Sequence, residues 1–166
     1  MAASWILPVR GVQVVLNITV LGLMAYVAQW WSTHWHQSSP SEVNFLIFAP
    51  AWSVLVLASV IIVPLKFSHM LSSKTAQIGL LAMEGLTMLY WFGGFVALAV
   101  FLSGRICFGT VCDVARASTA LSAINWLAWT VTFGYGVYQV VKGGSQWSFG
   151  ARQPEMSGKV EMHQGV

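Results

Sequence analysis

The sequence predicts an all-α integral membrane protein, folded as an antiparallel four-helix transmembrane bundle. Of its 166 residues, 57% are hydrophobic and only 8% are charged, and the mean hydropathy is +0.69. A soluble domain carries about 25% charged residues, so this composition is that of a membrane protein. In addition, four apolar stretches reach the ~20 residues that a membrane-spanning helix needs. They lie at about 9–31, 43–65, 78–103 and 114–141.

The first span, 9–31, is longer than the apolar region of a secretory signal. No small-residue cleavage site follows it, because a cut after Ala28 would place the bulky Tyr26 close to the cleaved bond. We therefore expect an uncleaved helix. Two histidines in the polar segment beyond it, His34 and His36, lack the cysteines or carboxylates of a metal site, apart from Glu42. We predict no metal there.

The second span, 43–65, contains Pro50, which is expected to kink the helix where neighbours satisfy the freed carbonyl. A short segment, 66–74, joins it to the third span, 78–103. Spans two and three should therefore be adjacent and antiparallel. Gly93 and Ala97 in the third span form a small-xxx-small step, which lets helices approach closely within the bundle or between two protomers.

The third span also carries a carboxylate, Glu84, which would cost at least ~2.5 kcal/mol in hydrocarbon. At about 1.5 Å per residue, it lies level with Asn17 and Tyr135, whereas Asn125 lies nearer the outer side. We predict that Glu84 faces the interior, wholly or partly protonated, and is hydrogen-bonded by Asn17, Tyr135 or its own helix's Thr87. Replacement by glutamine should then be nearly neutral, and replacement by leucine destabilising.

The segment before the fourth span, 114–141, contains Cys107 and Cys112. A close cysteine pair on an oxidising side predicts a structural disulfide; two free thiols are the alternative. A membrane redox enzyme would need a second cysteine pair for its relay, and this chain has two cysteines in all. With no assembled catalytic set and no cofactor motif, we expect no enzyme activity.

The lysines and arginines predict the orientation. Six lie on the side of both termini: Arg10, Lys66, Lys74, Lys142, Arg152 and Lys159. The other side holds Arg105 and Arg116. Cytoplasmic loops are enriched in such residues, so both termini should be cytoplasmic, and cations spread in this way indicate no nucleic-acid partner. Residues 1–142 form the predicted membrane domain, and 143–166, rich in Gly, Ser and Gln, a disordered cytoplasmic tail.

Three stretches together resemble fungal MARVEL-domain proteins over about residues 8–142. They are "NFLIFAPAWSVLVL" (44–57), "MEGLTMLYWFGGFVALA" (83–99) and "CDVARASTALSAINWLAWTVT" (112–132). The family pattern has an early glutamate and a Trp-x-x-Gly-Phe run in span three, and a cysteine-containing outer loop before span four. Here Asn125 precedes Trp126 where relatives often have glutamate.

The resemblance implies a non-enzymatic, membrane-organising protein of the plasma membrane, associated with lipid microdomains, membrane apposition or vesicle traffic. Its partners would be membrane lipids such as sterols or sphingolipids, a second copy of the chain, or other membrane proteins. Four aromatic residues are candidate lipid contacts: Trp91, Phe95, Trp126 and Trp129. The alternative is a small transporter, channel subunit or membrane-embedded enzyme that uses Glu84. The surroundings of Glu84, a cavity or packed helices, should discriminate between the two.

Overall fold

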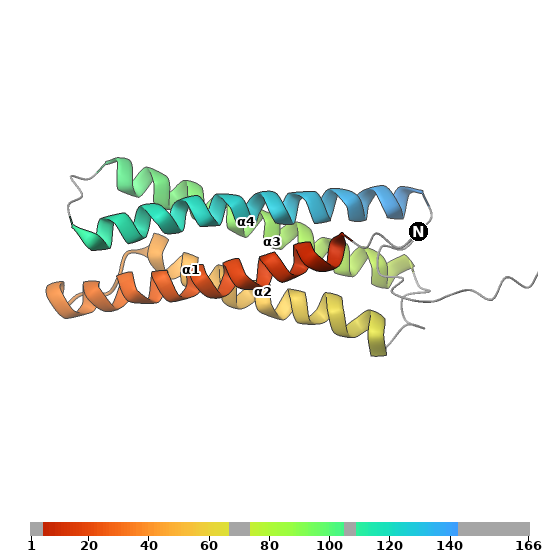
Figure 1. The fold of residues 1–166 in the computed structure, drawn as a ribbon, viewed down its shortest axis with the longest axis horizontal. Coiled ribbons are helices and arrows are strands. Elements are labelled where there is room, and N and C mark those ends of the chain that lie inside the picture. Colours follow the sequence, from red (N-terminus) through yellow and green to blue (C-terminus); the bar gives the residue numbers. More distant parts are fainter. Residues whose placement is uncertain (1–4, 67–73, 105–108, 143–166) are drawn as a thin grey trace, which may run out of the picture.

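The computed structural model describes residues 5–66, 74–104 and 109–142, which form four α-helices and no strand. The helices are α1 (Ile6–Trp35), α2 (Ser41–Lys66), α3 (Lys74–Ser103) and α4 (Thr110–Val141). They run up and down as an antiparallel bundle (Figure 1). Each helix packs against the next one in the chain, and α4 packs against α1. The predicted four-helix architecture is therefore confirmed, with α1 and α3 on one diagonal and α2 and α4 on the other.

The helices extend beyond the spans predicted from hydropathy. Helices α1 and α3 each have 30 residues and α4 has 32. At about 1.5 Å per residue they are about 45 Å long, against a hydrocarbon core of ~30 Å. Their terminal turns therefore belong to the headgroup regions, where polar residues can be helical. Helix α3, for example, begins at Lys74 rather than at residue 78.

Helix α4 differs from the others in composition. Helices α1, α2 and α3 are long and apolar enough to cross a membrane by themselves. The buried face of α4 instead carries several polar side chains: Ser118, Ser122, Asn125 and Thr132. The bundle covers these four groups, so they are not exposed to lipid.

Helices α2 and α3 are joined by two indole N–H groups. Trp91 of α3 is fully buried, and its Nε1 donates to Ser53 Oγ of α2 over 2.8 Å. In the opposite direction, Trp52 Nε1 of α2 donates to Thr87 Oγ1 of α3 over 3.2 Å. Between helices in lipid, packing and such polar bonds replace the hydrophobic effect as the source of association.

Helices α2 and α3 are tightly packed at Gly94. A Cβ at this glycine would lie 2.7 Å from Leu46 Cδ2, and Leu46 is fully buried and has little room to turn away. A Cβ on Gly93 would meet nothing within 4 Å, and Gly93 is exposed. Within the bundle, the small residue that the packing requires is thus Gly94, one position away from the predicted step.

We expect Gly94→Ala to destabilise the bundle by about 1–3 kcal/mol through overpacking against Leu46. Gly93→Ala is the matched control and should be neutral, or stabilising by up to about 1 kcal/mol through helix propensity. Unfolding of both variants in detergent micelles measures the difference. Equal stability of Gly94→Ala and Gly93→Ala would show that Leu46 does not restrict the size of the side chain at position 94.

Candidate functional site

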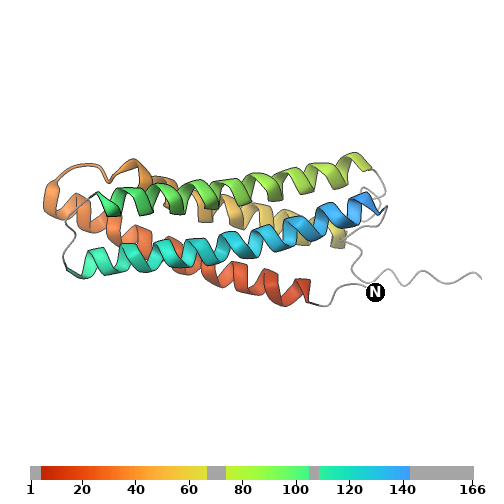
Figure 2. The same ribbon diagram turned by 90° about the horizontal axis from the view of Figure 1, so that it is seen from above.

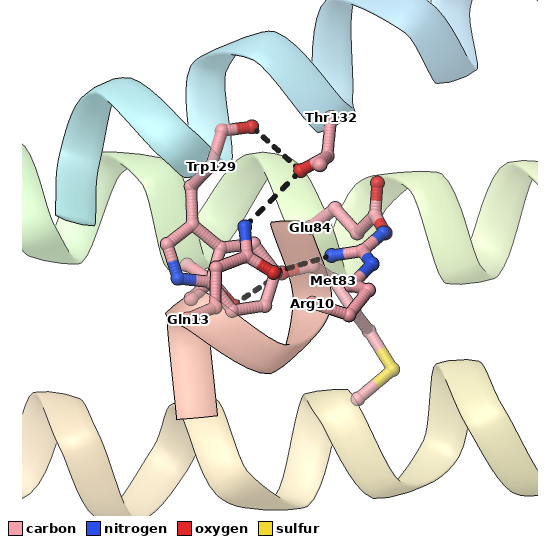
Figure 3. Close-up of polar contacts among 7 residues, drawn as sticks. Arg10, Gln13, Met83, Glu84, Trp129 and Thr132 are labelled. Carbon is pink, nitrogen blue, oxygen red and sulfur yellow. Dashed lines mark hydrogen bonds and ion pairs between the residues drawn. The ribbon is translucent and has the colours of Figure 1, made fainter. Parts of the chain in front are cut away.

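An ion pair lies in the interior of the bundle. Nη2 of Arg10 on α1 contacts Oε1 of Glu84 on α3, and both side chains are almost completely removed from solvent (Figure 3). Because α1 and α3 are on a diagonal of the bundle, the contact crosses its centre. The glutamate that hydropathy alone leaves unexplained therefore has a countercharge.

Helix α4 completes the surroundings of this pair. Arg10 Nη1 donates to Gln13 Oε1 over 3.1 Å, and Gln13 Nε2 donates to Thr132 Oγ1 of α4 over 3.4 Å. Thr132 Oγ1 in turn donates to the backbone carbonyl of Trp129 over 3.1 Å. The guanidinium carbon of Arg10 also lies 5.4 Å from the ring centroid of Trp129, within cation–π range. Three helices are thus joined through one arginine.

The hydrogen-bond partners predicted for Glu84 make other contacts. Asn17 Oδ1 accepts a hydrogen bond from Asn125 Nδ2 of α4 over 3.0 Å. The Tyr135 hydroxyl accepts one from Gln139 on its own helix. Thr87 Oγ1 donates to the backbone carbonyl of Met83 over 2.8 Å. Arg10, which was not among these three residues, joins Glu84 to α1.

From the sequence, Arg10 was counted among the charges on the side of the two termini, and the structure shows that its side chain is buried inside the bundle. It lies one turn inside α1, about 6 Å from the start of the helix, whereas Glu84 lies about 15 Å from the start of α3. Because α1 begins further inside the bundle than α3 does (Figure 1 and Figure 2), these two positions come close together. A helical pattern could have revealed this, because Arg10, Gln13 and Asn17 follow one another at i, i+3 and i+7 and share one buried face of α1.

This geometry is suited to holding helices together. A buried ion pair contributes little net stability by itself, but removal of one partner leaves a costly uncompensated charge. Among the residues that the structure describes, no three His, Cys, Asp or Glu side chains are grouped so that they could hold a metal ion. The site connects α1 and α3 through matched charges, and α4 through the hydrogen bond from Gln13 to Thr132.

Comparison with protein families identifies the domain. The model of the MARVEL family, a membrane-associating domain, matches residues 3–135. The chain belongs to the MARVEL family. The MARVEL domain is a four-span membrane domain, so helices α1 to α4, including the less apolar α4, are its spans. Comparisons with curated proteins and with solved structures found no match.

Two of the four aromatic residues expected to contact lipid are inside the MARVEL domain instead. Trp91 and Trp129 have no exposed surface, so they cannot face acyl chains. Phe95 and Trp126 are partly exposed and form an α3–α4 aromatic cluster with Phe92, with ring centroids 5.4–5.7 Å apart.

A second aromatic cluster was missed in the sequence. It lies between α2 and α3 and consists of Phe45, Phe48, Trp52 and Tyr90. Adjacent rings in this α2–α3 aromatic cluster have centroids 5.8–6.3 Å apart. The i, i+3 and i, i+4 spacing of Phe45, Phe48 and Trp52 is the signal that could have revealed it.

The predicted disulfide involves one described residue of the MARVEL domain. Cys112 is buried in the first turn of α4. Cys107 lies outside the described residues, as does the tail 143–166. The disulfide and the disorder of the tail therefore stay predictions.

Proposed function

We propose that this protein organises membranes without catalysis, acting through the shape and the lipid-facing surface of its MARVEL domain. The role fits association with lipid microdomains, membrane apposition or vesicle traffic, as in the fungal branch of the family that the sequence resembles. The observation that carries the proposal is the ion pair. Glu84, the residue on which a transporter or enzyme would depend, is packed at the bundle centre against Arg10. Its charge is used to connect helices.

The outer surface supports the same proposal. Large apolar side chains are exposed on all four helices, among them Val15, Leu55, Val100 and Leu127. The two aromatic clusters interrupt this aliphatic surface with flat rings, of which Phe48 and Phe92 are 47% and 45% exposed. Rigid rings beside aliphatic chains suit the flat ring system of a sterol. A sterol- or sphingolipid-rich membrane is therefore the proposed environment, with a second copy of the chain or another membrane protein as further candidate partners.

The plasma membrane with both termini in the cytoplasm is the proposed placement. The start of α1 and the end of α4 lie at the same end of the bundle (Figure 2). Without Arg10, which is buried, five lysines and arginines remain on that side and two on the other. This charge asymmetry still favours a cytoplasmic position for both termini.

Reconstitution of the full chain tests the function. In giant vesicles that separate into sterol-rich ordered and disordered phases, we expect enrichment in the sterol-rich phase, reduced when Phe95 and Trp126 are both replaced by leucine. Liposomes should show neither solute flux nor lipid turnover. The control is the double variant Arg10→Met with Glu84→Leu, which replaces both charges by apolar groups; it should partition as the wild type does. Flux or turnover that this folded double variant abolishes would instead establish the transporter or enzyme alternative.

A further inference from the structure

A row of buried polar atoms without partners lies between α1 and α4. On α4 the atoms are Ser118 Oγ, Ser122 Oγ, Asn125 Oδ1 and Trp129 Nε1, and α1 adds Asn17 Nδ2. All five residues are fully buried, and these atoms have no hydrogen-bond partner in the described protein. We call this row the α1–α4 polar file.

Such a concentration of unpaired groups calls for a physical explanation. Each buried donor or acceptor left unsatisfied costs about 1–3 kcal/mol, and native proteins satisfy the great majority of them. The equally buried Trp91 follows this rule, because its indole N–H is bonded to Ser53. The polar file is therefore expected to have a partner that is not part of the protein chain.

The spacing of the file fits small bridging molecules. Its α4 members follow one another at i, i+4, i+7 and i+11, so they lie along one face of the helix. Neighbours at such positions have Cβ atoms ≈ 5–6 Å apart, and two hydrogen bonds of about 2.8 Å through one water cover that distance. A buried water needs two to four polar partners, which adjacent members of the file can supply.

The chemistry of the file favours water over an ion. Its groups are two hydroxyls, an amide N–H, an amide carbonyl and an indole N–H, a neutral mixture of donors and acceptors. The nearby charges, Arg10 and Glu84, neutralise each other. On the α1 side, the register of the Asn17–Asn125 hydrogen bond brings the apolar Val20 and Met24 level with Ser122 and Ser118. A neutral molecule that both donates and accepts is required.

We propose that ordered water molecules occupy the α1–α4 polar file, from Ser118 near the outer end of α4 to Trp129 beside the ion pair. Arg10 Nε, also buried without a partner, extends the line of unsatisfied polar atoms to the ion pair itself. The waters solvate the seam between α1 and α4 and connect it to the Arg10–Glu84 contact. This inference does not depend on the proposed function.

Radiolytic hydroxyl-radical labelling of the full chain in lipid nanodiscs tests the proposal, because radicals formed from a buried water oxidise the side chains beside it. Trp129 and Trp91 are a matched pair: both have no exposed surface, but only Trp91 has its indole N–H bonded within the protein. We expect Trp129 to be oxidised several-fold faster than Trp91. Equal and slow oxidation of both would overturn the proposal.

A second measurement uses the double variant Ser118→Ala with Ser122→Ala. In a hydrated file the waters lose partners, so oxidation of Trp129 should fall, that of Trp91 should not change, and the bundle should become less stable. In a dry seam the same change removes unsatisfied hydroxyls and should increase stability, which would contradict the proposal, as would unchanged labelling of Trp129. The control is Ser59→Ala, whose exposed hydroxyl bonds only the carbonyl of Leu55 on its own helix.

Discussion

Replacement of Arg10 by methionine should destabilise the bundle by about 3–5 kcal/mol, because it removes the countercharge that Glu84 has across the core. Glu84→Leu should cost a similar amount by leaving the Arg10 guanidinium uncompensated. The double variant should recover most of the loss, since a buried pair can often be replaced by apolar residues of similar volume at little cost. Equilibrium unfolding in mixed micelles, arranged as a double-mutant cycle, gives the coupling energy between the two residues.

Glu84→Gln distinguishes the ion pair from neutral hydrogen bonding. A protonated carboxyl that merely bridges helices is well replaced by an amide, which is why the sequence alone predicted a nearly neutral effect. With Arg10 as the partner, the amide cannot balance the guanidinium, so we now expect Glu84→Gln to lose most of what Glu84→Leu loses. A useful scale is Asn17→Leu, which breaks a neutral pair with Asn125 worth about 0.6–2 kcal/mol. If Glu84→Gln proved as stable as the wild type, Glu84 would instead be interpreted as a protonated carboxyl that forms neutral hydrogen bonds.

The helices and their order could be predicted from the sequence because lipid and the bundle interior are both apolar, so α1, α2 and α3 appear as long hydrophobic stretches and α4 as a less apolar one. The same fact hides which face of a helix is inside. Trp91 and Phe92 are adjacent and equally apolar, yet Trp91 is fully buried and Phe92 is 45% exposed. Consecutive residues point about 100° apart around a helix, and hydropathy does not show which of the two directions leads to lipid.

In a membrane protein, polar residues indicate which face of a helix is buried better than apolar residues do. The candidate site shows where this indication was overlooked. Glu84 could be placed inside because a charge in lipid is costly. Its partner was missed because Arg10 was counted among the charges that flank the first span, whereas its side chain is buried and contacts the glutamate. The polar face formed by Arg10, Gln13 and Asn17 was the better guide, because burial of three polar side chains on one face requires partners on other helices.

Trp91→Ala should destabilise the bundle by about 3–5 kcal/mol, through loss of packing and the cavity left in its place. The indole fills the interior between α3 and α2, and its N–H satisfies Ser53, which itself donates to the carbonyl of Ala49 over 2.8 Å. Trp91→Phe keeps most of the volume and should cost only about 0.5–1.5 kcal/mol for the lost hydrogen bond.

The neighbouring Phe92→Ala is the control for Trp91→Ala, because it removes a comparable aromatic ring from a partly lipid-facing position and should change stability far less. Denaturation in mixed micelles measures all three variants. If Phe92→Ala proved as harmful as Trp91→Ala, the rings facing lipid would be as important for the fold as the buried indole. The association of α2 with α3 would then depend on the outer aromatic surface as much as on the interior packing and the Ser53 hydrogen bond.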